Sequence, residues 1–104
     1  MTNIVLVGFK RSPFTIANKG LLAGVRPEDI LSQEINDLIK TTNINKDDIE
    51  DIIAGCAYPE GAQGYNIAKI VSFMTGMPEH VGGMTINRWC GSSMQAIHSA
   101  AGAI

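Results

Sequence analysis

Short apolar runs alternate with amphipathic helical segments along the whole chain, and this alternation limits the possible folds most strongly. The run Ile4-Val5-Leu6-Val7 is apolar throughout and ends at Gly8, as is typical of a strand buried on both faces of a parallel sheet. The pattern continues with a helix over 27–40, a strand over 51–57, a helix over about 65–75, a strand over 84–86 and a helix from about residue 90. This order predicts an α/β fold with right-handed crossovers.

The predicted helices carry start and stop signals, except at the end of the chain. Pro27, followed by Glu28 and Asp29, suits a first helical turn, and Gly76 with Pro78 ends the second helix. The final stretch SAAGAI has no capping residue and no charged last turn. Three strands would also leave sheet edges that a larger domain normally covers. We therefore expect the chain to end within its third helix and the domain to be incomplete.

Composition and charge restrict the class of partner. The chain has 104 residues, enough for one domain at most, and its net charge of −2 with scattered Lys and Arg argues against a nucleic-acid partner. No apolar run is long enough to span a bilayer, and the apolar run at the N-terminus is too short for a signal peptide. We therefore expect a cytoplasmic protein with reduced thiols.

The two cysteines do not form a metal-binding pattern. Cys56 and Cys90 are far apart in sequence, and neither histidine stands at ligand spacing from them. The sequence therefore predicts no metal site, and the reducing compartment argues against a disulfide.

Cys90 lies where a strand passes into a helix, in the stretch NRWCGSSMQAI. The first turn of a helix presents free N–H groups and a positive dipole end, which favour the nucleophilic thiolate. Gly91, Ser92 and Ser93 are small, so a substrate can approach the sulfur and the Gly91 N–H can stay accessible. The N–H of Cys90 could also donate to an oxyanion on the attacked carbonyl. These features point to acyl transfer through a thioester, with an inert buried cysteine as the alternative.

A base for this cysteine is missing from the neighbouring sequence. His98 follows Cys90 by eight residues, which is ~12 Å along a regular helix and too far for contact. His80 lies in a loop ten residues before Cys90, and the nearest carboxylate, Glu79, reads as a solvated loop charge. The sequence thus provides a nucleophile without an evident base.

Four segments, in their order and spacing, form a recognisable series. They are RSPF at 11–14, Gly55-Cys56, QGYNIAK at 63–69 and TINRWCGSSMQA at 85–96. Together they resemble the N-terminal part of the thiolases, and most closely the degradative 3-ketoacyl-CoA thiolases of fatty-acid β-oxidation. The departures are Ser12 for a common Thr, Ser93 for a common Gly, and Trp89 where smaller or aliphatic residues are usual. The pair Ser93-Met94 is itself similar to the β-oxidation branch.

The resemblance implies a fold, a reaction and a set of site residues. Residues 1–104 would be the N-terminal part of a thiolase-like α/β/α layered domain, with the CoA-binding loop region and the C-terminal domain outside the chain. Cys90 would accept the acyl group from a 3-ketoacyl-CoA and pass it to CoA, a substrate rather than a bound cofactor. Met94 lies next to the helical turn of Cys90, and two roles are open for it: core packing, or lining the acyl pocket. The activating histidine and the second catalytic cysteine would lie outside the chain, and Cys56 matches a structural position.

The resemblance also implies partners and leaves alternatives open. The full protein would be a homodimer or homotetramer, and a β-oxidation partner subunit is a further expectation. The chain alone would have little or no turnover, because parts of an active site act as a unit. One alternative is a non-catalytic fragment or oligomerisation module, and another is a biosynthetic acetoacetyl-CoA thiolase. A redox sensor is disfavoured because no resolving cysteine stands beside Cys90.

Overall fold

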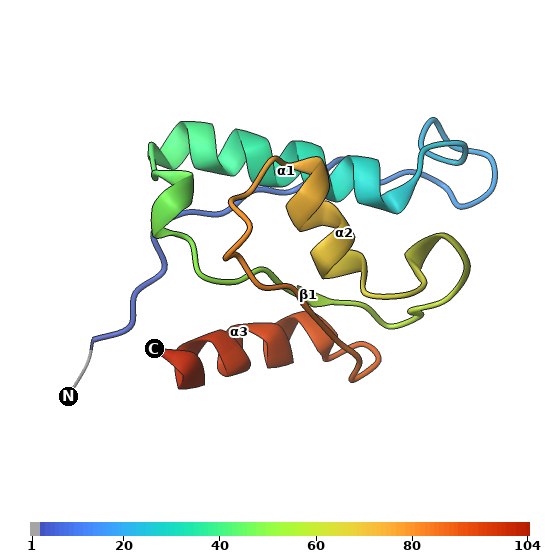
Figure 1. Cartoon of the computed structure of the whole chain (residues 1–104). Coiled ribbons are helices and arrows are strands. Elements are labelled where there is room, and N and C mark those ends of the chain that lie inside the picture. The colour runs from blue at the N-terminus through green and yellow to red at the C-terminus, as the bar shows by residue number, and fades with distance from the viewer. Residues whose placement is uncertain (1–2) are drawn as a thin grey trace.

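A two-stranded parallel sheet lies at the centre of the computed structural model, which describes residues 3–104 (Figure 1). Strands β1 (Ile53–Gly55) and β2 (Met84–Ile86) pair with Ile53 opposite Met84 and Gly55 opposite Ile86. The helices of the described chain are α1 (Pro27–Thr42), α2 (Ile67–Met74) and α3 (Ser92–Ala103), with single 3₁₀ turns at Lys46–Asp48 and Gly61–Gln63. Strands β1 and β2 are parallel, and the chain that connects them contains α2, which confirms the predicted α/β class.

The helices lie in two layers on opposite faces of this small sheet. Helices α1 and α2 contact each other on one face, whereas α3 packs against β1 from the other (Figure 1). The arrangement is the α/β/α layering that the resemblance implied. Because α3 crosses the sheet near the end of β1, the residues just before α3 are brought to the carboxyl ends of both strands.

Local chemistry explains where the helices begin and end. Helix α1 starts at Pro27, carries acidic residues in its first turn, and ends at Asn43, which has the left-handed φ of 56° common at helix C-termini. Helix α2 is capped by Asn66, whose side-chain oxygen accepts a hydrogen bond from the Lys69 N–H. The Asn66 amide group also donates to the Gly83 carbonyl at 2.7 Å, which ties the start of α2 to the approach to β2.

The prediction of a strand over residues 4–7 is wrong. Ile4, Val5, Leu6 and Val7 are 48–83 % exposed and make no strand. The following residues run beside α1, where Lys10 Nζ lies 2.6 Å from Asp37 Oδ2. A strand needs a neighbour for its N–H and C=O groups, and the segment pairs with neither β1 nor β2. An apolar pattern alone therefore does not make a strand without an available edge.

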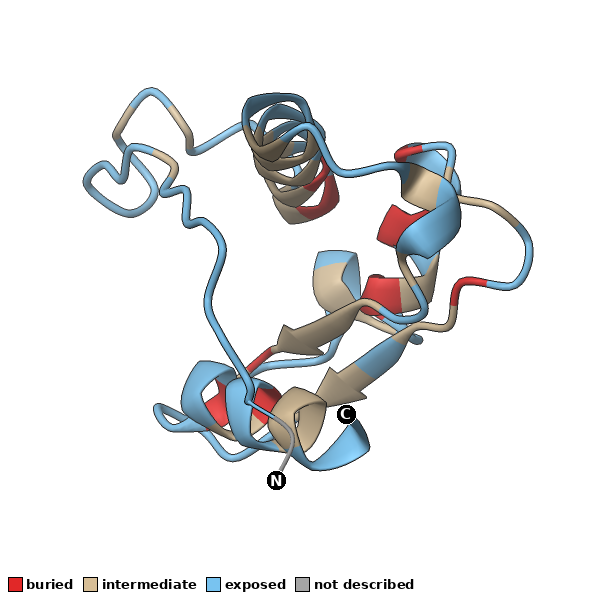
Figure 2. Ribbon diagram, turned by 90° about the vertical axis from the view of Figure 1, so that its left-hand side faces the viewer, coloured by how far each residue is buried: buried red, intermediate tan, exposed pale blue. Residues whose placement is uncertain are grey.

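The core is small and lies between α1, α2 and β1. Cys56, Ile67 and Val71 are buried together, and Leu31 and Ile35 of α1 pack against them. Most of the remaining ribbon is exposed or only partly buried (Figure 2). On α2, Ile70 and Met74 are 37 % and 43 % exposed, whereas Ile67, Ala68 and Val71 are buried. Among residues 3–104, no helix has the length and apolar character needed to cross a bilayer.

Candidate active site

A tight turn carries Cys90 from β2 into α3. Strand β2 ends at Ile86 and α3 begins at Ser92, so Cys90 lies two residues before the first helical residue, with its side chain exposed. The Gly91 N–H donates to the Arg88 carbonyl at 3.0 Å, which closes a four-residue turn with Trp89 and Cys90 at its centre. The predicted helix start near Cys90 is thus confirmed to within two residues.

The backbone at Trp89 is strained. Its φ of 47° lies in the left-handed region, which a bulky residue adopts at a cost of about 1–3 kcal/mol. The side chain is 77 % exposed. Strained residues of this kind cluster at functional sites. The strain here lies immediately before the sulfur-bearing residue.

Polar side chains on both sides of the turn hold this conformation. The Ser92 hydroxyl accepts a hydrogen bond from the Arg88 N–H at 2.8 Å and donates one to the Trp89 carbonyl at 2.6 Å. Asn87 Oδ1 accepts from the Trp89 N–H at 2.9 Å, and the Arg88 guanidinium donates to Gln95 Oε1 at 2.6 Å. The turn is thereby fixed both to Asn87, the residue after β2, and to the first two turns of α3.

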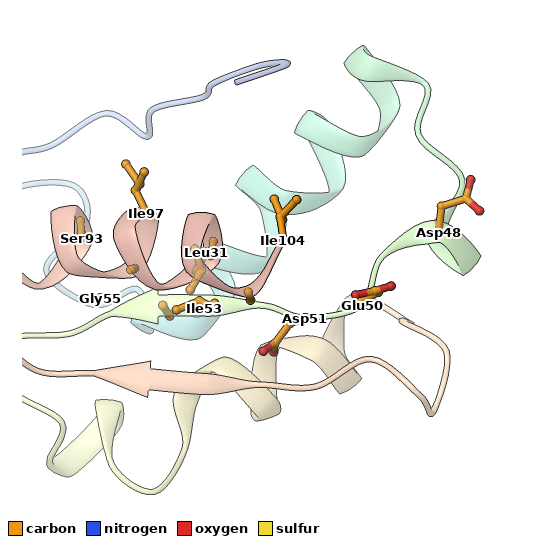
Figure 3. Close-up of a pocket in the computed structure, with 13 residues that line it drawn as sticks. Leu31, Asp48, Glu50, Asp51, Ile53, Gly55, Ser93, Ile97 and Ile104 are labelled. Atoms are coloured by element: carbon orange, nitrogen blue, oxygen red, sulfur yellow. The ribbon is translucent and has the colours of Figure 1, made fainter. Parts of the chain in front are cut away.

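Gly55 brings the start of α3 against the sheet. A Cβ at this position would lie 2.4 Å from the Ser93 nitrogen and 2.5 Å from the Ser92 carbonyl carbon. Such distances are far below ordinary contact, so only glycine allows α3 to approach this closely. Gly55 and Ser93 lie side by side at one end of the β1–α3 contact (Figure 3). Sequence reasoning missed this role, although a strand-end glycine and small residues at the helix start were both visible.

The backbone N–H groups near Cys90 differ in availability. The expectation that the Gly91 N–H stays accessible is wrong, because it donates within the turn. The Ser92 N–H donates to the Trp89 carbonyl at 3.1 Å and is committed as well. Within residues 3–104, the N–H of Cys90 makes no hydrogen bond. This N–H is therefore available as a donor to an oxyanion formed at its own sulfur.

The other residues predicted from the sequence do not complete a catalytic group around Cys90. Both histidines are exposed: His98 lies along α3, and His80 Nε2 lies 3.2 Å from the Ile49 carbonyl oxygen. Met94 is 59 % exposed on the first turn of α3. Cys56 is 6 % exposed in the core, where its thiol donates to Gln63 Oε1 at 3.5 Å, as expected of a structural cysteine. No cluster of potential metal ligands occurs among residues 3–104.

Among residues 3–104, a large and a small hollow lie near α3, and the small one adjoins Cys90. An open groove of about 870 Å³ runs between β1 and α3, with Ile97 and Ile104 on its helical side and Asp48 and Glu50 at its far end (Figure 3). None of residues 87–92 lines it. A shallower hollow of about 270 Å³ is lined by 87–89, the three residues that precede Cys90. The candidate site is therefore the Cys90 turn rather than the larger groove.

Comparisons with known proteins agree with this placement in the fold. Residues 4–104 match the family described as "Thiolase, N-terminal domain". The chain is 38 % identical over 105 residues to a 3-ketoacyl-CoA thiolase of Colwellia psychrerythraea and 39 % identical to one of Aeromonas salmonicida. Each alignment covers 100 % of this chain and 27 % of the relative, so the chain spans about a quarter of the length of these proteins.

Solved structures show the same relationship. An acetyl-CoA acetyltransferase from Syntrophomonas wolfei superposes with a TM-score of 0.72 at 26 % identity, over 81 % of this chain and 21 % of that one. The thiolase Acat5 from Ascaris suum, in complex with coenzyme A, gives a TM-score of 0.74 at 28 % identity, over 84 % and 22 %. The family match, the identities and the shared fold together show that this chain belongs to the thiolase family, within its N-terminal domain.

Proposed function

We propose that Cys90 is the acyl-accepting nucleophile of a thiolase-type acyltransferase that cleaves 3-ketoacyl-CoA to acetyl-CoA and a shortened acyl-CoA. The observation that carries the proposal is the exposed Cys90 sulfur on a strained turn at the start of α3. Its support comes from the matching motif and from relatives named 3-ketoacyl-CoA thiolase. The fold alone would not carry it, because function belongs to the site.

The reaction has two steps that return the cysteine to its starting state. The Cys90 thiolate attacks the ketone carbon of the substrate, and the bond between that carbon and the neighbouring CH₂ breaks. The departing carbanion takes up a proton and leaves as acetyl-CoA, while the acyl group stays on sulfur as a thioester. The thiol of a second CoA then gives up its proton and attacks this thioester. The products are the shortened acyl-CoA and the Cys90 thiolate.

Residues 3–104 perform only part of this two-step reaction. Cys90 supplies the sulfur, its N–H supports the oxyanion, and Met94 on the first turn of α3 contacts the acyl chain. The groups that move the two protons belong to a part of the protein outside residues 3–104, so the chain alone has negligible turnover. CoA as substrate is supported by the coenzyme A complex of the Ascaris suum thiolase. The working protein is a cytoplasmic homo-oligomer in this proposal.

Mass spectrometry of the folded chain tests the nucleophile directly. The chain is mixed with acetyl-CoA or a longer acyl-CoA, and the peptides carrying Cys90 and Cys56 are analysed for an acyl adduct. We expect an adduct on Cys90 alone and none in Cys90→Ser, with buried Cys56 as the internal control. Labelling of both thiols, or of Cys56 alone, would refute the assignment. Acyl-chain preference then separates a degradative from a biosynthetic thiolase.

A further inference from the structure

Ser92 is the first residue of α3, yet both hydrogen bonds of its hydroxyl go to the turn that carries Cys90. The hydroxyl accepts from the Arg88 N–H at 2.8 Å and donates to the Trp89 carbonyl at 2.6 Å. These two groups lie at opposite ends of the Arg88–Trp89 pair, so the hydroxyl fixes the backbone dihedral angles between them. Ser92 is only 3 % exposed, and water therefore cannot readily replace these bonds.

Packing does not explain why Trp89 keeps its unfavourable backbone conformation. Trp89 is 77 % exposed, so no enclosing side chains hold it in the left-handed region. The restraints that remain are hydrogen bonds to its backbone: the Trp89 carbonyl accepts from the Ser92 hydroxyl and the Ser92 N–H, and the Trp89 N–H donates to Asn87 Oδ1. The Ser92 hydroxyl also accepts from the N–H of the preceding Arg88. Without the hydroxyl, two of these four hydrogen bonds are lost, among them the one made by the Arg88 N–H, and we expect Trp89 to relax to negative φ and Cys90 to turn with it.

We propose that Ser92 is the positioning residue of the nucleophile: its buried hydroxyl holds Trp89 at positive φ and thereby directs the exposed Cys90 sulfur. We call this restraint, in which the Ser92 hydroxyl holds Trp89 at positive φ, the lock. Its catalytic meaning rests on the proposed function of Cys90, but the lock itself is a property of the turn. Ser92 acts through Trp89 and touches no substrate. A displacement of a reacting atom by 1 Å lowers a rate by about 100-fold, so a modest rotation of the turn is sufficient to matter.

Nuclear magnetic resonance tests the lock without any substrate. A positive φ brings the amide and α protons of Trp89 together, so we expect a strong intraresidue NOE in the wild-type chain and protection of the Arg88 amide from exchange. Both signals weaken in Ser92→Ala and are retained in Ser92→Thr, which keeps the hydroxyl. Ser99→Ala, the same substitution two turns along α3, leaves both unchanged. A strong Trp89 NOE in folded Ser92→Ala overturns the proposal, as does an unprotected Arg88 amide in the wild type.

Acyl transfer and alkylation test the consequence for Cys90. Ser92→Ala should accept acyl groups from acyl-CoA about 10–100-fold more slowly than the wild type, with Ser92→Thr restoring most of the rate. Alkylation by iodoacetamide, which needs an accessible sulfur but no fixed direction, should change less than threefold (about half a logarithmic unit). Equal acyl transfer in Ser92→Ala and wild type would overturn the positioning role. A wild-type chain that accepts no acyl group contradicts the proposed function instead, and the NOE still decides the lock.

Discussion

The contact between Gly55 and α3 gives the sharpest test of how the fold positions Cys90. In Gly55→Ala the new Cβ would lie 2.4–2.6 Å from the backbone of Ser92 and Ser93, whereas ordinary contact begins at 3.4 Å. The start of α3 must therefore move by about 1 Å, because backbone atoms cannot rotate away as a side chain can. Overpacking of this kind costs about 1–3 kcal/mol. Alanine recovers about 0.5–1 kcal/mol of chain entropy, and because the clash is with backbone atoms we expect the upper part of the cost to apply, with a net loss of up to about 2.5 kcal/mol.

Urea denaturation measures this loss, with Gly102→Ala as the matched control. Gly102 lies in α3, the helix that Gly55 contacts, and a Cβ at position 102 meets nothing within 4 Å. We expect the control to leave the free energy of unfolding unchanged or to raise it by up to about 1 kcal/mol. Circular dichroism follows the helices, and the fluorescence of Trp89, the only tryptophan, reports on the Cys90 turn. If Gly55→Ala were as stable as Gly102→Ala, the close approach of α3 to β1 would be refuted.

Two further predictions concern the cap of α2 and the response to acid. Asn66→Ala should lower the free energy of unfolding by about 1–2 kcal/mol in urea, while Asn36→Ala on the exposed side of α1 changes it by less than about 0.5 kcal/mol; equal effects would contradict the capping role. The pKa of Glu28 is lowered from its ordinary 4.5 mainly by a hydrogen bond from its own backbone N–H, and the pKa of Asp37 from 3.8 by hydrogen bonding to Lys10. A carboxyl group whose pKa is lowered on folding stabilises the protein at pH values above its unfolded-state pKa, and this stability is lost on acidification. The urea concentration at the unfolding midpoint should therefore decrease as the pH is lowered from about 4.5; a midpoint that stays constant down to about pH 3 would refute this.

Much of the candidate site is readable from the sequence because its signals are local or recur as a motif. The handover from strand to helix around Cys90 was predicted to within two residues, and Cys56 was assigned to the core. The sequence also indicated that His98 is no base for this sulfur, since it follows Cys90 by eight residues along the helix. What the sequence did not reveal is the geometry of the turn, where Trp89 takes a positive φ and Ser92 holds it. Nothing in a tryptophan's intrinsic preference predicts such a backbone.

The sequence by itself determined the order of the three helices and of strands β1 and β2, the approximate helix ends, and the place of Cys90 between β2 and α3. These follow from short-range chemistry: Pro27 at a helix start, Asn66 as a cap, and small residues after Cys90. Tertiary structure alone decided which apolar run became a strand, because pairing needs a free edge in the right place. It also decided the close approach at Gly55, since that contact joins residues almost forty positions apart. The conformational preferences of neighbouring residues determine the helices and strands. The direction of the Cys90 sulfur depends instead on contacts between those helices and strands.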